Sequence, residues 1–417
     1  MRVLLINTND NQGGAAIACR RLMKALEKQR VSVRMLVLNK DTQDTRIAEV
    51  APSTAGRLRK KIGFLSERLQ IFLQNRFSRK RLFTVSTACC GVDITAHPWV
   101  KEADVLHLHW VNHGMLSLQG MEKLLQMGKP VVWTMHDLWE ATGICHHPGE
   151  CDRFKSDCGK CPLLNSTSLH DLSARVMARK KRFLPGAGIH FVGCSDWLVQ
   201  QARQSILAAG NTYSVIPNPI DTHFFTPGDK QEARLRLGLP TDKKLILFGA
   251  ANATDKRKGI DYLREALLHL APLKDQVELV MCGKMKSESE ISFGLNVHLT
   301  GYVADPLVMA DLYRAADLFV TPSLEENLPN MIMEAMACGT PCVGFRIGGI
   351  PEMISHRHTG YLAHYRSSED LADGIRWLLD APASVKEEAR KFVEDHYTPQ
   401  VVAAQYLAVY RSLNPSI

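Results

Sequence analysis

The chain has 417 residues, of which 45% are hydrophobic and 23% are charged. This composition excludes a disordered or fibrous chain and suits two globular domains of about 200 residues each. Lys and Arg outnumber Asp and Glu by 51 to 43, a net charge of +8, which suits anionic ligands or an anionic membrane surface but does not by itself predict nucleic-acid binding.

The compartment follows from the apolar runs and the cysteines. No apolar run reaches the ~18–20 residues that a membrane span needs, and the apolar start of the chain is too short for a signal-peptide core. Eleven cysteines, an odd number, indicate a reducing environment. We therefore expect a cytoplasmic protein, either free or peripherally bound to the cytoplasmic face of the membrane.

Short apolar runs alternate with helical patterns along the whole chain, which is typical of parallel β-α-β units. Both halves are therefore expected to be doubly wound, Rossmann-like sheets, which bind ligands beyond the carboxyl ends of their strands. The predicted strands lie at 3–6, 33–37, 105–109, 131–134 and 190–193 in the first half, and at 245–248, 278–282, 318–321 and 341–344 in the second.

The domain boundary is predicted from a proline-rich stretch. Residues 214–228 contain three prolines, which cannot continue a helix or a central strand and so favour a stiff linker. We expect an N-terminal domain at 1–213 and a C-terminal domain at 229–396. Residues 397–417 are predicted to form a helix that crosses back to the N-terminal domain.

Candidate ligand-binding residues follow two strands of the first half. Gly13 and Gly14 come after the first strand and open a helix, where glycine lets a backbone approach a ligand closely; a tight turn without a ligand is the alternative. His136 ends another strand, and its imidazole can accept or donate a hydrogen bond and exchange a proton near neutral pH. His107 and His109 share one strand face and fit a core role as well as a ligand contact.

Residues 57–83 form a basic helical insert with nine basic side chains and one acidic side chain, Glu67. Such a helix either lies on anionic lipid or packs its apolar side into the core with its basic side in solvent, and both interpretations stay open. Apolar residues recur in it at helical spacing: Leu58, Ile62, Leu65, Leu69, Phe72 and Leu73.

A cysteine-rich loop occupies residues 145–161. Four thiolates within one loop can form a tetrahedral structural zinc site that folds an insert without a core. The spacing is looser than a paired Cys-x2-Cys knuckle, so disulfides or reduced thiols remain the alternative. The four residues are Cys145, Cys151, Cys158 and Cys161.

A basic loop follows the strand predicted at 245–248. Arg257 and Lys258 could stabilise the negative charge of a diphosphate, Arg through bidentate contacts and Lys as a point charge. The alternative is a solvated basic loop. The chain has no Asp-x-Asp motif, so no catalytic divalent metal is expected.

Two carboxylates flank the start of a helix predicted at 330–338. Glu326 lies in the loop before this helix, and Glu334 lies about one turn inside it. A helix N-terminus attracts anions through its unpaired N–H groups and its dipole, and carboxylates accept hydrogen bonds from hydroxyl groups. Together they suit a ligand that carries both phosphate and hydroxyls, although two solvated glutamates are the alternative.

This Glu-x7-Glu pair, with the Ala-Met-Ala-x-Gly-x-Pro that follows it, resembles the family-4 retaining glycosyltransferases of GT-B architecture. Four further segments agree with the family pattern, in the expected order: Ile216-Pro-Asn-Pro-Ile-Asp221, Lys258-Gly259, Thr300-Gly-Tyr-Val303 and Gly348-Gly-Ile-Pro-Glu352. The resemblance implies an α/β chain with two doubly wound Rossmann-like domains that face one another across a deep cleft. The domain at 1–213 would lie on the acceptor side, and the domain at 229–396 would bind the nucleotide sugar.

The resemblance also implies roles for individual residues. Glu326 would contact the donor sugar and act in catalysis together with His136, and Glu334 would bind the ribose. The diphosphate or its surroundings would be bound by Lys258, Arg257, Val303, Gly13 and Gly14, and by backbone N–H groups near Asn330 and Met331. The family usually has an arginine where Ala250 follows Gly249. Arg257 could replace it from the longer loop, and whether it does so is left open. Whether retention uses Glu326 as a nucleophile or front-face attack assisted by the leaving phosphate is left open.

The expected function is transfer of a sugar from a nucleotide-diphosphate donor to an acceptor hydroxyl. Colanic-acid and exopolysaccharide enzymes of this family carry a similar cysteine-rich insert, which favours a lipid-linked or growing oligosaccharide acceptor in bacterial surface polysaccharide biosynthesis. One alternative is a catalytically silent GT-B scaffold that binds nucleotide or sugar, and another is a GT-B sugar-phosphate epimerase or phosphorylase. No nucleic-acid partner is expected.

Overall fold

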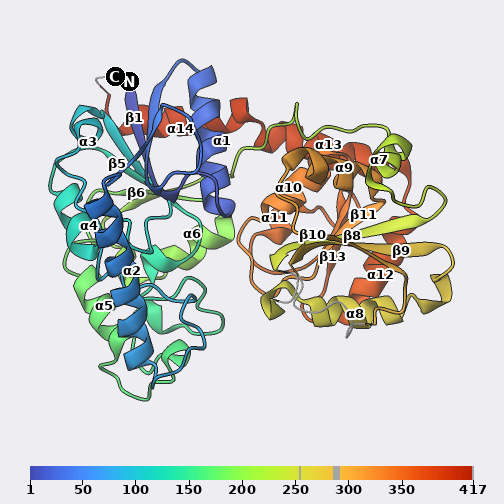
Figure 1. Ribbon diagram of the computed structural model, residues 1–417, viewed down its shortest axis with the longest axis horizontal. Helices are drawn as coiled ribbons and strands as arrows, with labels where there is room; N and C mark the ends of the chain where they lie inside the picture. Colours follow the sequence, from blue (N-terminus) through green and yellow to red (C-terminus); the bar gives the residue numbers. More distant parts are fainter. Residues whose placement is uncertain (253–254, 285–291, 416–417) are drawn as a thin grey trace. The chain divides into compact units, whose positions relative to one another are not determined.

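The computed structural model describes residues 1–252, 255–284 and 292–415, which fold into two compact units (Figure 1). Unit 1 comprises Met1–Pro219 and Val402–Ile417, and unit 2 comprises Ile220–Val401. Each unit contains one parallel sheet. The predicted fold class, two Rossmann-like α/β domains, is therefore confirmed.

The sheet of unit 1 has the order β3-β2-β1-β4-β5-β6-β7. Val3 on β1 pairs with Val33 on one side and with Val105 on the other. The strand order reverses between β1 and β4, which is the point at which open parallel sheets bind ligands. The strands are β1 (Arg2–Asn9), β2 (Ser32–Asn39), β3 (Ile47–Glu49), β4 (Val105–Leu108), β5 (Val131–Met135), β6 (His190–Gly193) and β7 (Thr212–Val215).

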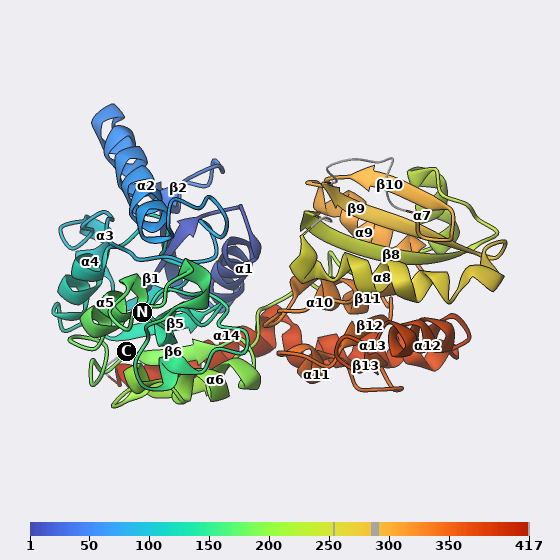
Figure 2. The same ribbon diagram turned by 90° about the horizontal axis from the view of Figure 1, so that it is seen from below.

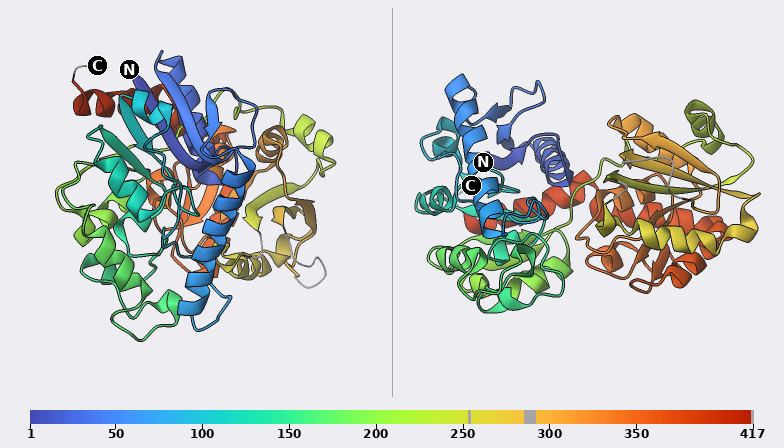
Figure 3. Two further views of the ribbon diagram at one scale, coloured as in Figure 1. Left: turned by 60° about the vertical axis from the view of Figure 1, so that its left-hand side comes forward. Right: turned by 60° about the horizontal axis from the view of Figure 1, so that its bottom comes forward.

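Helices cover both faces of this sheet (Figure 3). Because successive side chains of a strand point to opposite faces, Val3 and Leu5 pack in a core with α1 and α14, whereas Leu4 and Ile6 pack in a second core that includes α4. The helices are α1 (Gly14–Lys28), α2 (Thr54–Gln74), α3 (Pro98–Glu102), α4 (Leu118–Leu125), α5 (Leu172–Lys180), α6 (Asp196–Arg203) and α14 (Pro399–Leu413), with short 3-10 turns at Trp139–Ala141, Arg153–Lys155, Pro162–Leu164 and Ile206–Ala208.

The sheet of unit 2 has the order β10-β9-β8-β11-β12-β13, and its order reverses between β8 and β11. The strands are β8 (Lys244–Asn252), β9 (Val277–Lys284), β10 (Val297–Gly301), β11 (Leu318–Thr321), β12 (Cys342–Phe345) and β13 (Gly360–Ala363). The helices are α7 (Lys230–Leu237), α8 (Ile260–Leu268), α9 (Pro306–Ala315), α10 (Asn330–Ala337), α11 (Ile350–Met353), α12 (Ser368–Leu379) and α13 (Ala383–Tyr397), with 3-10 turns at Lys256–Lys258 and Ala271–Leu273.

The stretch at the unit boundary differs in detail from the sequence expectation. Ser214 and Val215 belong to β7, so the extended connector begins after them, and the units divide at Pro219. Helix α14 contributes Tyr406 and Tyr410 to the core of unit 1.

None of the helices that the structure describes combines the length and the apolar character that a membrane crossing needs.

Candidate functional site

Three loops of unit 2 meet at the carboxyl edge of its sheet. The loop after β8 carries Lys258, the loop after β11 carries Glu326, and the loop after β12 carries Gly348. Backbone hydrogen bonds join them: the Leu324 N–H donates to the Arg257 carbonyl over 2.7 Å, and the N–H of the residue after Gly348 donates to the Asn327 carbonyl over 3.0 Å. Residues far apart in the sequence are therefore held in one small region.

Glycines permit this close approach. Gly259 and Gly348 have φ angles of 72° and 57°, a left-handed conformation that favours glycine. A Cβ atom at Gly259 would lie 1.8 Å from the Pro322 carbonyl oxygen, and one at Gly348 would lie 1.8 Å from the Glu326 carbonyl oxygen. Two of the glycine motifs noted in the sequence thus have a packing reason at this site.

An ion pair joins the predicted cation to the predicted catalytic carboxylate. Lys258 Nζ donates to Glu326 Oε1, which also accepts a hydrogen bond from Ser323 Oγ over 3.1 Å. Glu326 and Lys258 are half-buried, whereas Ser323 is buried. The pair leaves a positive and a negative group side by side at the strand ends. Ser323 was not singled out from the sequence, and only its position two residues after β11 could have indicated it.

Helix α10 begins beside this pair. Its N-cap, Pro329, has no polar side chain and supplies no capping hydrogen bond. Asn330 and Met331, the predicted diphosphate contacts, form its first residues and are half-buried. The Met331 side chain packs closely against Gly249: a Cβ atom added at Gly249 would lie 2.3 Å from Met331 Cε.

Glu334 lies one turn inside α10 and has a buried partner. The hydroxyl of Tyr313 donates to Glu334 Oε2 over 2.9 Å. Burial, and then the nearby carboxylate, raise the pKa of Tyr313 well above its ordinary value, so the tyrosine remains a hydrogen-bond donor. No motif selected Tyr313, which lies on α9 and orients the predicted ribose-binding carboxylate.

Arg257 differs from Lys258 in its environment. Its guanidinium is exposed and donates to Asp255 Oδ2 over 2.7 Å, within its own loop. That hydrogen bond raises the pKa of Arg257. Ala250, the position that usually holds the family arginine, is buried. In this structure Arg257 is therefore bound to Asp255, and the nearby carboxylates of Glu325 and Glu326 raise its pKa further. Val303, another predicted contact, is half-buried in the loop after β10.

In unit 1, His136 follows β5 and lies between side chains of the two neighbouring strand ends. Its Nε2 is 3.1 Å from His109 Nδ1, and its Nδ1 is 3.8 Å from Cys194 Sγ. Burial lowers the pKa of His136 to about 4 and that of His109 well below its ordinary value. At neutral pH both imidazoles are uncharged and can exchange hydrogen bonds, but neither supplies a cation.

A buried hydrogen-bond network supports these histidines from α14. His107 Nδ1 is 2.7 Å from the Tyr410 hydroxyl, and His107 Nε2 is 2.8 Å from Thr134 Oγ1, which in turn is 2.8 Å from the Tyr406 hydroxyl. His107 is thus a core residue with both ring nitrogens bonded. The ring centroids of His107 and His109 are 4.3 Å apart, as their alternation along the chain predicted.

Polar atoms without partners gather where the strand order of unit 1 reverses. Among the described residues, His109 Nε2 and both polar side-chain atoms of Asn112 are buried without a hydrogen bond. The Asn112 carbonyl accepts from Thr8 Oγ1 of β1 over 2.8 Å, which places this residue at the β1–β4 boundary. Buried polar atoms normally have partners, so these atoms are suited to a ligand or to ordered water. Asn112 was missed because a lone asparagine carries no motif.

The glycine pair of unit 1 lies in the loop after β1. Gly13 has a φ of 89° and is the N-cap of α1, without a side-chain capping bond. Gly13 and Gly14 are exposed, and a Cβ at Gly13 would meet nothing within 4 Å. The loop therefore has open space in front of it, as a ligand-approach role requires.

A second buried chain of polar groups lies beside His136. The Asp137 carboxylate accepts from Trp110 Nε1 over 3.0 Å and is 2.8 Å from His146 Nδ1, whose other ring nitrogen is 2.9 Å from Ser86 Oγ. Burial alone would raise the pKa of Asp137, but His146 lowers it below the ordinary value. Because Ser86 and Asp137 are buried, this chain positions the loop after β5 and does not offer a reachable nucleophile.

The cysteine-rich loop contains free thiols. Burial, and then the three neighbouring thiols, raise the pKa of Cys145 to about 12, and burial raises that of Cys161 to about 11, so both favour the protonated form. Over residues 1–252, 255–284 and 292–415, no group of three or more His, Cys, Asp or Glu side chains is arranged to hold a metal ion. Zinc bound by Cys145, Cys151, Cys158 and Cys161 stays a prediction.

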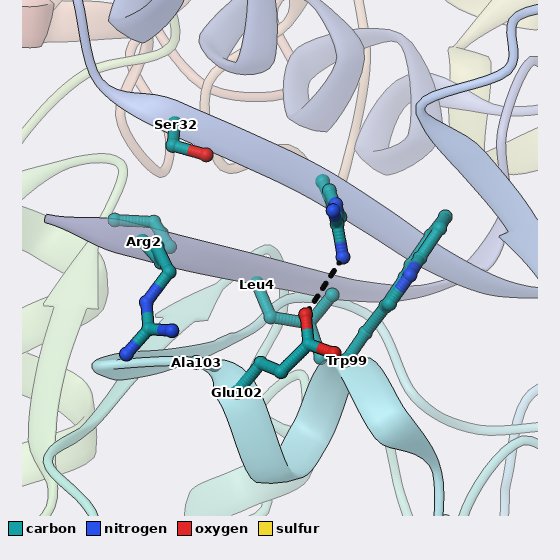
Figure 4. Close-up of a pocket in the computed structure, with 8 residues that line it drawn as sticks. Arg2, Leu4, Ser32, Trp99, Glu102 and Ala103 are labelled. Carbon is teal, nitrogen blue, oxygen red and sulfur yellow. Dashed lines mark hydrogen bonds and ion pairs between the residues drawn. The ribbon is translucent and has the colours of Figure 1, made fainter.

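A small cavity of about 40 Å³ lies elsewhere, at the amino ends of β1 and β2 beside α3 (Figure 4). The Arg34 guanidinium covers the Trp99 ring at 5.0 Å and pairs with Glu102 over 3.0 Å. The cavity contains none of the predicted site residues, and it opens at the edge of the sheet opposite the carboxyl ends of the strands. We therefore do not assign it to the candidate site.

Two family models match the chain. The model described as Glycosyltransferase Family 4 matches residues 12–224, slightly more than half of the chain. The model described as Glycosyl transferases group 1 matches residues 242–381. Together they cover most of both units and include all of the strand-end loops described above.

Curated proteins and solved structures give similar results. The chain is 34% identical over 304 residues to D-inositol 3-phosphate glycosyltransferase 1 of Catenulispora acidiphila, a match that covers 67% of this chain and 65% of the relative. The chain spans about half to two thirds of the length of the curated relatives it matches. Sucrose-phosphate synthase from Thermosynechococcus elongatus superposes over 100% of both chains with a TM-score of 0.68 and 18% identity. The Anabaena protein HepE, solved with UDP-glucose, superposes over 99% of this chain and 100% of its own, with a TM-score of 0.63 and 17% identity. At these identities the structures show the fold alone.

Proposed function

Since the chain belongs to glycosyltransferase family 4, we propose that it is a retaining glycosyltransferase that moves a sugar from a nucleotide-diphosphate donor to an acceptor hydroxyl. The observation that carries this proposal is the Lys258–Glu326 pair at the start of α10. A phosphate-binding helix terminus, a fixed cation and a hydroxyl-accepting carboxylate are the three groups that a nucleotide sugar needs.

The reaction steps follow from these groups. As the bond to the sugar breaks, negative charge develops on the leaving diphosphate, and preorganised cations and N–H groups stabilise that charge. Lys258 and the first N–H groups of α10 are the groups proposed for this role. Glu326, held by Ser323 and Lys258, would accept hydrogen bonds from sugar hydroxyls, and Glu334, oriented by Tyr313, from the ribose.

His136 is proposed to contact the transferred sugar or the acceptor in the same reaction. Its pKa is lowered to about 4, so the imidazole is neutral at physiological pH and binds a hydroxyl as a donor or an acceptor. Gly13 and Gly14 are proposed to let the backbone approach the donor phosphates. The retained anomeric configuration would be checked by NMR of the product.

For the acceptor we propose a lipid-linked or growing oligosaccharide of bacterial surface polysaccharide, made at the cytoplasmic side of the membrane. The cysteine-rich insert, similar to that of colanic-acid and exopolysaccharide enzymes, supports this proposal. The names of the curated relatives suggest a second acceptor, D-inositol 3-phosphate. Parallel transfer assays with this compound and with a lipid-linked oligosaccharide would separate the two.

The test is a thermal-shift panel of UDP, GDP, ADP, CMP and dTDP on the wild type, on Lys258→Ala and on the matched control Lys256→Ala, which removes a neighbouring exposed cation. A ligand at 100 times its Kd stabilises the folded state by about 2.7 kcal/mol, or roughly 5–10 °C for a unit of this size. One diphosphate is expected to shift the wild type and the control but not Lys258→Ala. If none shifts any of them, the proposed donor site is wrong.

The silent scaffold remains the second candidate because two observations favour it. Ala250 replaces the usual arginine, and Arg257 is bound to Asp255. A silent scaffold would give the same thermal shift but would release no nucleoside diphosphate from any sugar donor in the presence of acceptor. Release of the diphosphate together with a glycosylated product would also exclude an epimerase or a phosphorylase.

A further inference from the structure

The outer face of α2 is apolar and exposed, and Figures 2 and 3 show this helix at the periphery of unit 1. Five aliphatic side chains at spacings of three and four residues form one stripe, each with 48–59% of its surface exposed. At 1.5 Å per residue the stripe is about 22 Å long. We call it the α2 stripe; its members are Leu58, Ile62, Leu65, Leu69 and Leu73.

The inner face of the same helix is largely polar. Glu67 is buried and accepts from the backbone N–H groups of Thr87 and Ala88 over 2.6 and 2.9 Å. The buried Arg68 pairs with Glu67 over 2.7 Å, and Lys60 Nζ donates to the Leu38 carbonyl over 2.7 Å. Of the three buried residues of α2, only Ile71 is apolar, and it packs in the core of unit 1. Specific polar contacts therefore provide much of the attachment of α2, and the five aliphatic side chains of its outer face remain in solvent.

Basic residues surround the stripe. The one acidic side chain between residues 54 and 83 is Glu67, which is buried. Two aromatic side chains beyond the helix, Phe77 and Phe83, are 68% and 64% exposed. The exposed basic residues of the segment are Arg57, Arg59, Lys61, Arg76, Arg79, Lys80 and Arg81.

We infer that the α2 stripe and its basic flanks bind the surface of an anionic lipid bilayer. An apolar stripe with Lys and Arg beside it matches both layers of such a surface, since the leucines enter the acyl boundary and the cations remain among the anionic headgroups. A second copy of the chain fits less well, because two such faces would oppose their basic residues. This inference does not depend on the proposed transfer activity, since it concerns binding in the absence of substrate.

The experiment is co-sedimentation of the full chain with vesicles of phosphatidylcholine alone or with 30% phosphatidylglycerol. Leu65→Gln/Leu69→Gln is expected to weaken binding to the anionic vesicles on the order of 100-fold, about tenfold for each leucine withdrawn from lipid. Arg57→Gln/Arg59→Gln/Lys61→Gln is expected to weaken it on the order of 100-fold, about fivefold per charge. Binding to phosphatidylcholine alone is expected to be weak, and added salt should reduce binding to the anionic vesicles.

The matched control is Leu235→Gln/Leu307→Gln, which makes the same change at two leucines of unit 2 that are 71% and 61% exposed; its binding should equal that of the wild type. Thermal melting should show all variants folded, because every changed side chain is exposed. Absence of wild-type binding to the anionic vesicles, or binding that survives both α2 variants, would overturn the inference. Self-association in gel filtration that Leu65→Gln/Leu69→Gln abolishes, without vesicle binding, would assign the stripe to a second copy.

Discussion

Gly348→Ala tests whether the site of unit 2 depends on the contact between its loops. Gly348 has a φ of 57°, and a Cβ atom there would lie 1.8 Å from the carbonyl oxygen of Glu326. Real Cβ atoms do not approach oxygen so closely, so the loop after β12 must move away from the loop after β11. Glu326 belongs to the loop after β11, so the same movement would displace its carboxylate.

The magnitude has two parts. The left-handed conformation costs a non-glycine residue roughly 1–2 kcal/mol, and forcing an extra methyl group against a packed neighbour adds about 1–3 kcal/mol. Gly238 separates them, because it has a similar φ of 65° with nothing within 4 Å of its Cβ position. Gly238→Ala is therefore expected to lose the first part alone, and Gly348→Ala both, for a total of about 2–5 kcal/mol.

Urea unfolding of both variants measures this difference, and diphosphate titration of the same samples measures the site. Gly348→Ala should be less stable than Gly238→Ala and should also bind the donor diphosphate more weakly, whereas Gly238→Ala should bind it as the wild type does. Equal stabilities for the two variants, or unchanged diphosphate binding by Gly348→Ala, would refute the proposed dependence of Glu326 on this contact.

Three further changes test other parts of the molecule. Glu67→Ala should lower the free energy of unfolding in urea by about 2–4 kcal/mol, because it leaves two buried backbone N–H groups and the buried Arg68 guanidinium without their acceptor. A decrease of less than about 1 kcal/mol would contradict the attachment of α2 through Glu67. Burial lowers the pKa of His107 to about 3, so between about pH 6.5 and that value the unfolded chain binds one proton more than the folded chain, and the free energy of unfolding falls as the pH falls. His107→Gln should reduce the slope of unfolding free energy against pH by about 1.4 kcal/mol per pH unit over this range. An unchanged slope would mean that His107 is not buried as a neutral ring. By calorimetric titration, Arg257→Ala should weaken diphosphate binding less than about tenfold, because Asp255 already binds the arginine. Lys258→Ala should weaken it about 30-fold or more. The reverse order would show that Arg257 replaces the missing family arginine.

The central strands of both sheets were predicted from the sequence, and the edge strands were not. All nine predicted strands exist with small shifts in their ends, whereas β3, β7, β10 and β13, which the sequence analysis did not find, are the four edge strands of the two sheets. A central parallel strand is buried on both faces and reads as a continuous apolar run. Two of the edge strands lack that signal: Thr212–Val215 is half-exposed or exposed throughout, and Val297–Gly301 has no buried residue. Exposure does not explain β13, which is buried throughout but has only four residues, Gly360–Ala363.

The candidate site could be predicted as a set of motifs but not as a set of contacts. Glu326 and Lys258 were selected by their motifs, and a parallel sheet brings the ends of successive strands together. Their ion pair, and the attachment of Arg257 to Asp255, depend on side-chain directions that spacing does not determine. The supporting residues Ser323 and Tyr313 were missed because single hydroxyl side chains carry no pattern of their own.

The basic helix shows most clearly where sequence patterns stop being informative. The spacing of Leu58 to Leu73 indicates an apolar side of a helix, but it is the same whether that side faces the core or the solvent. The orientation of the helix depends on its other side, where Glu67 accepts hydrogen bonds from backbone N–H groups of another segment. No pattern along the helix itself could reveal these partners. Burying a carboxylate and a guanidinium is unfavourable unless they are paired and hydrogen-bonded, and turning the leucines inward would have avoided that cost. An arrangement that keeps five large aliphatic side chains in water and charged groups inside is therefore best explained by a surface that receives the leucines, and the surrounding positive charge indicates that this surface is anionic.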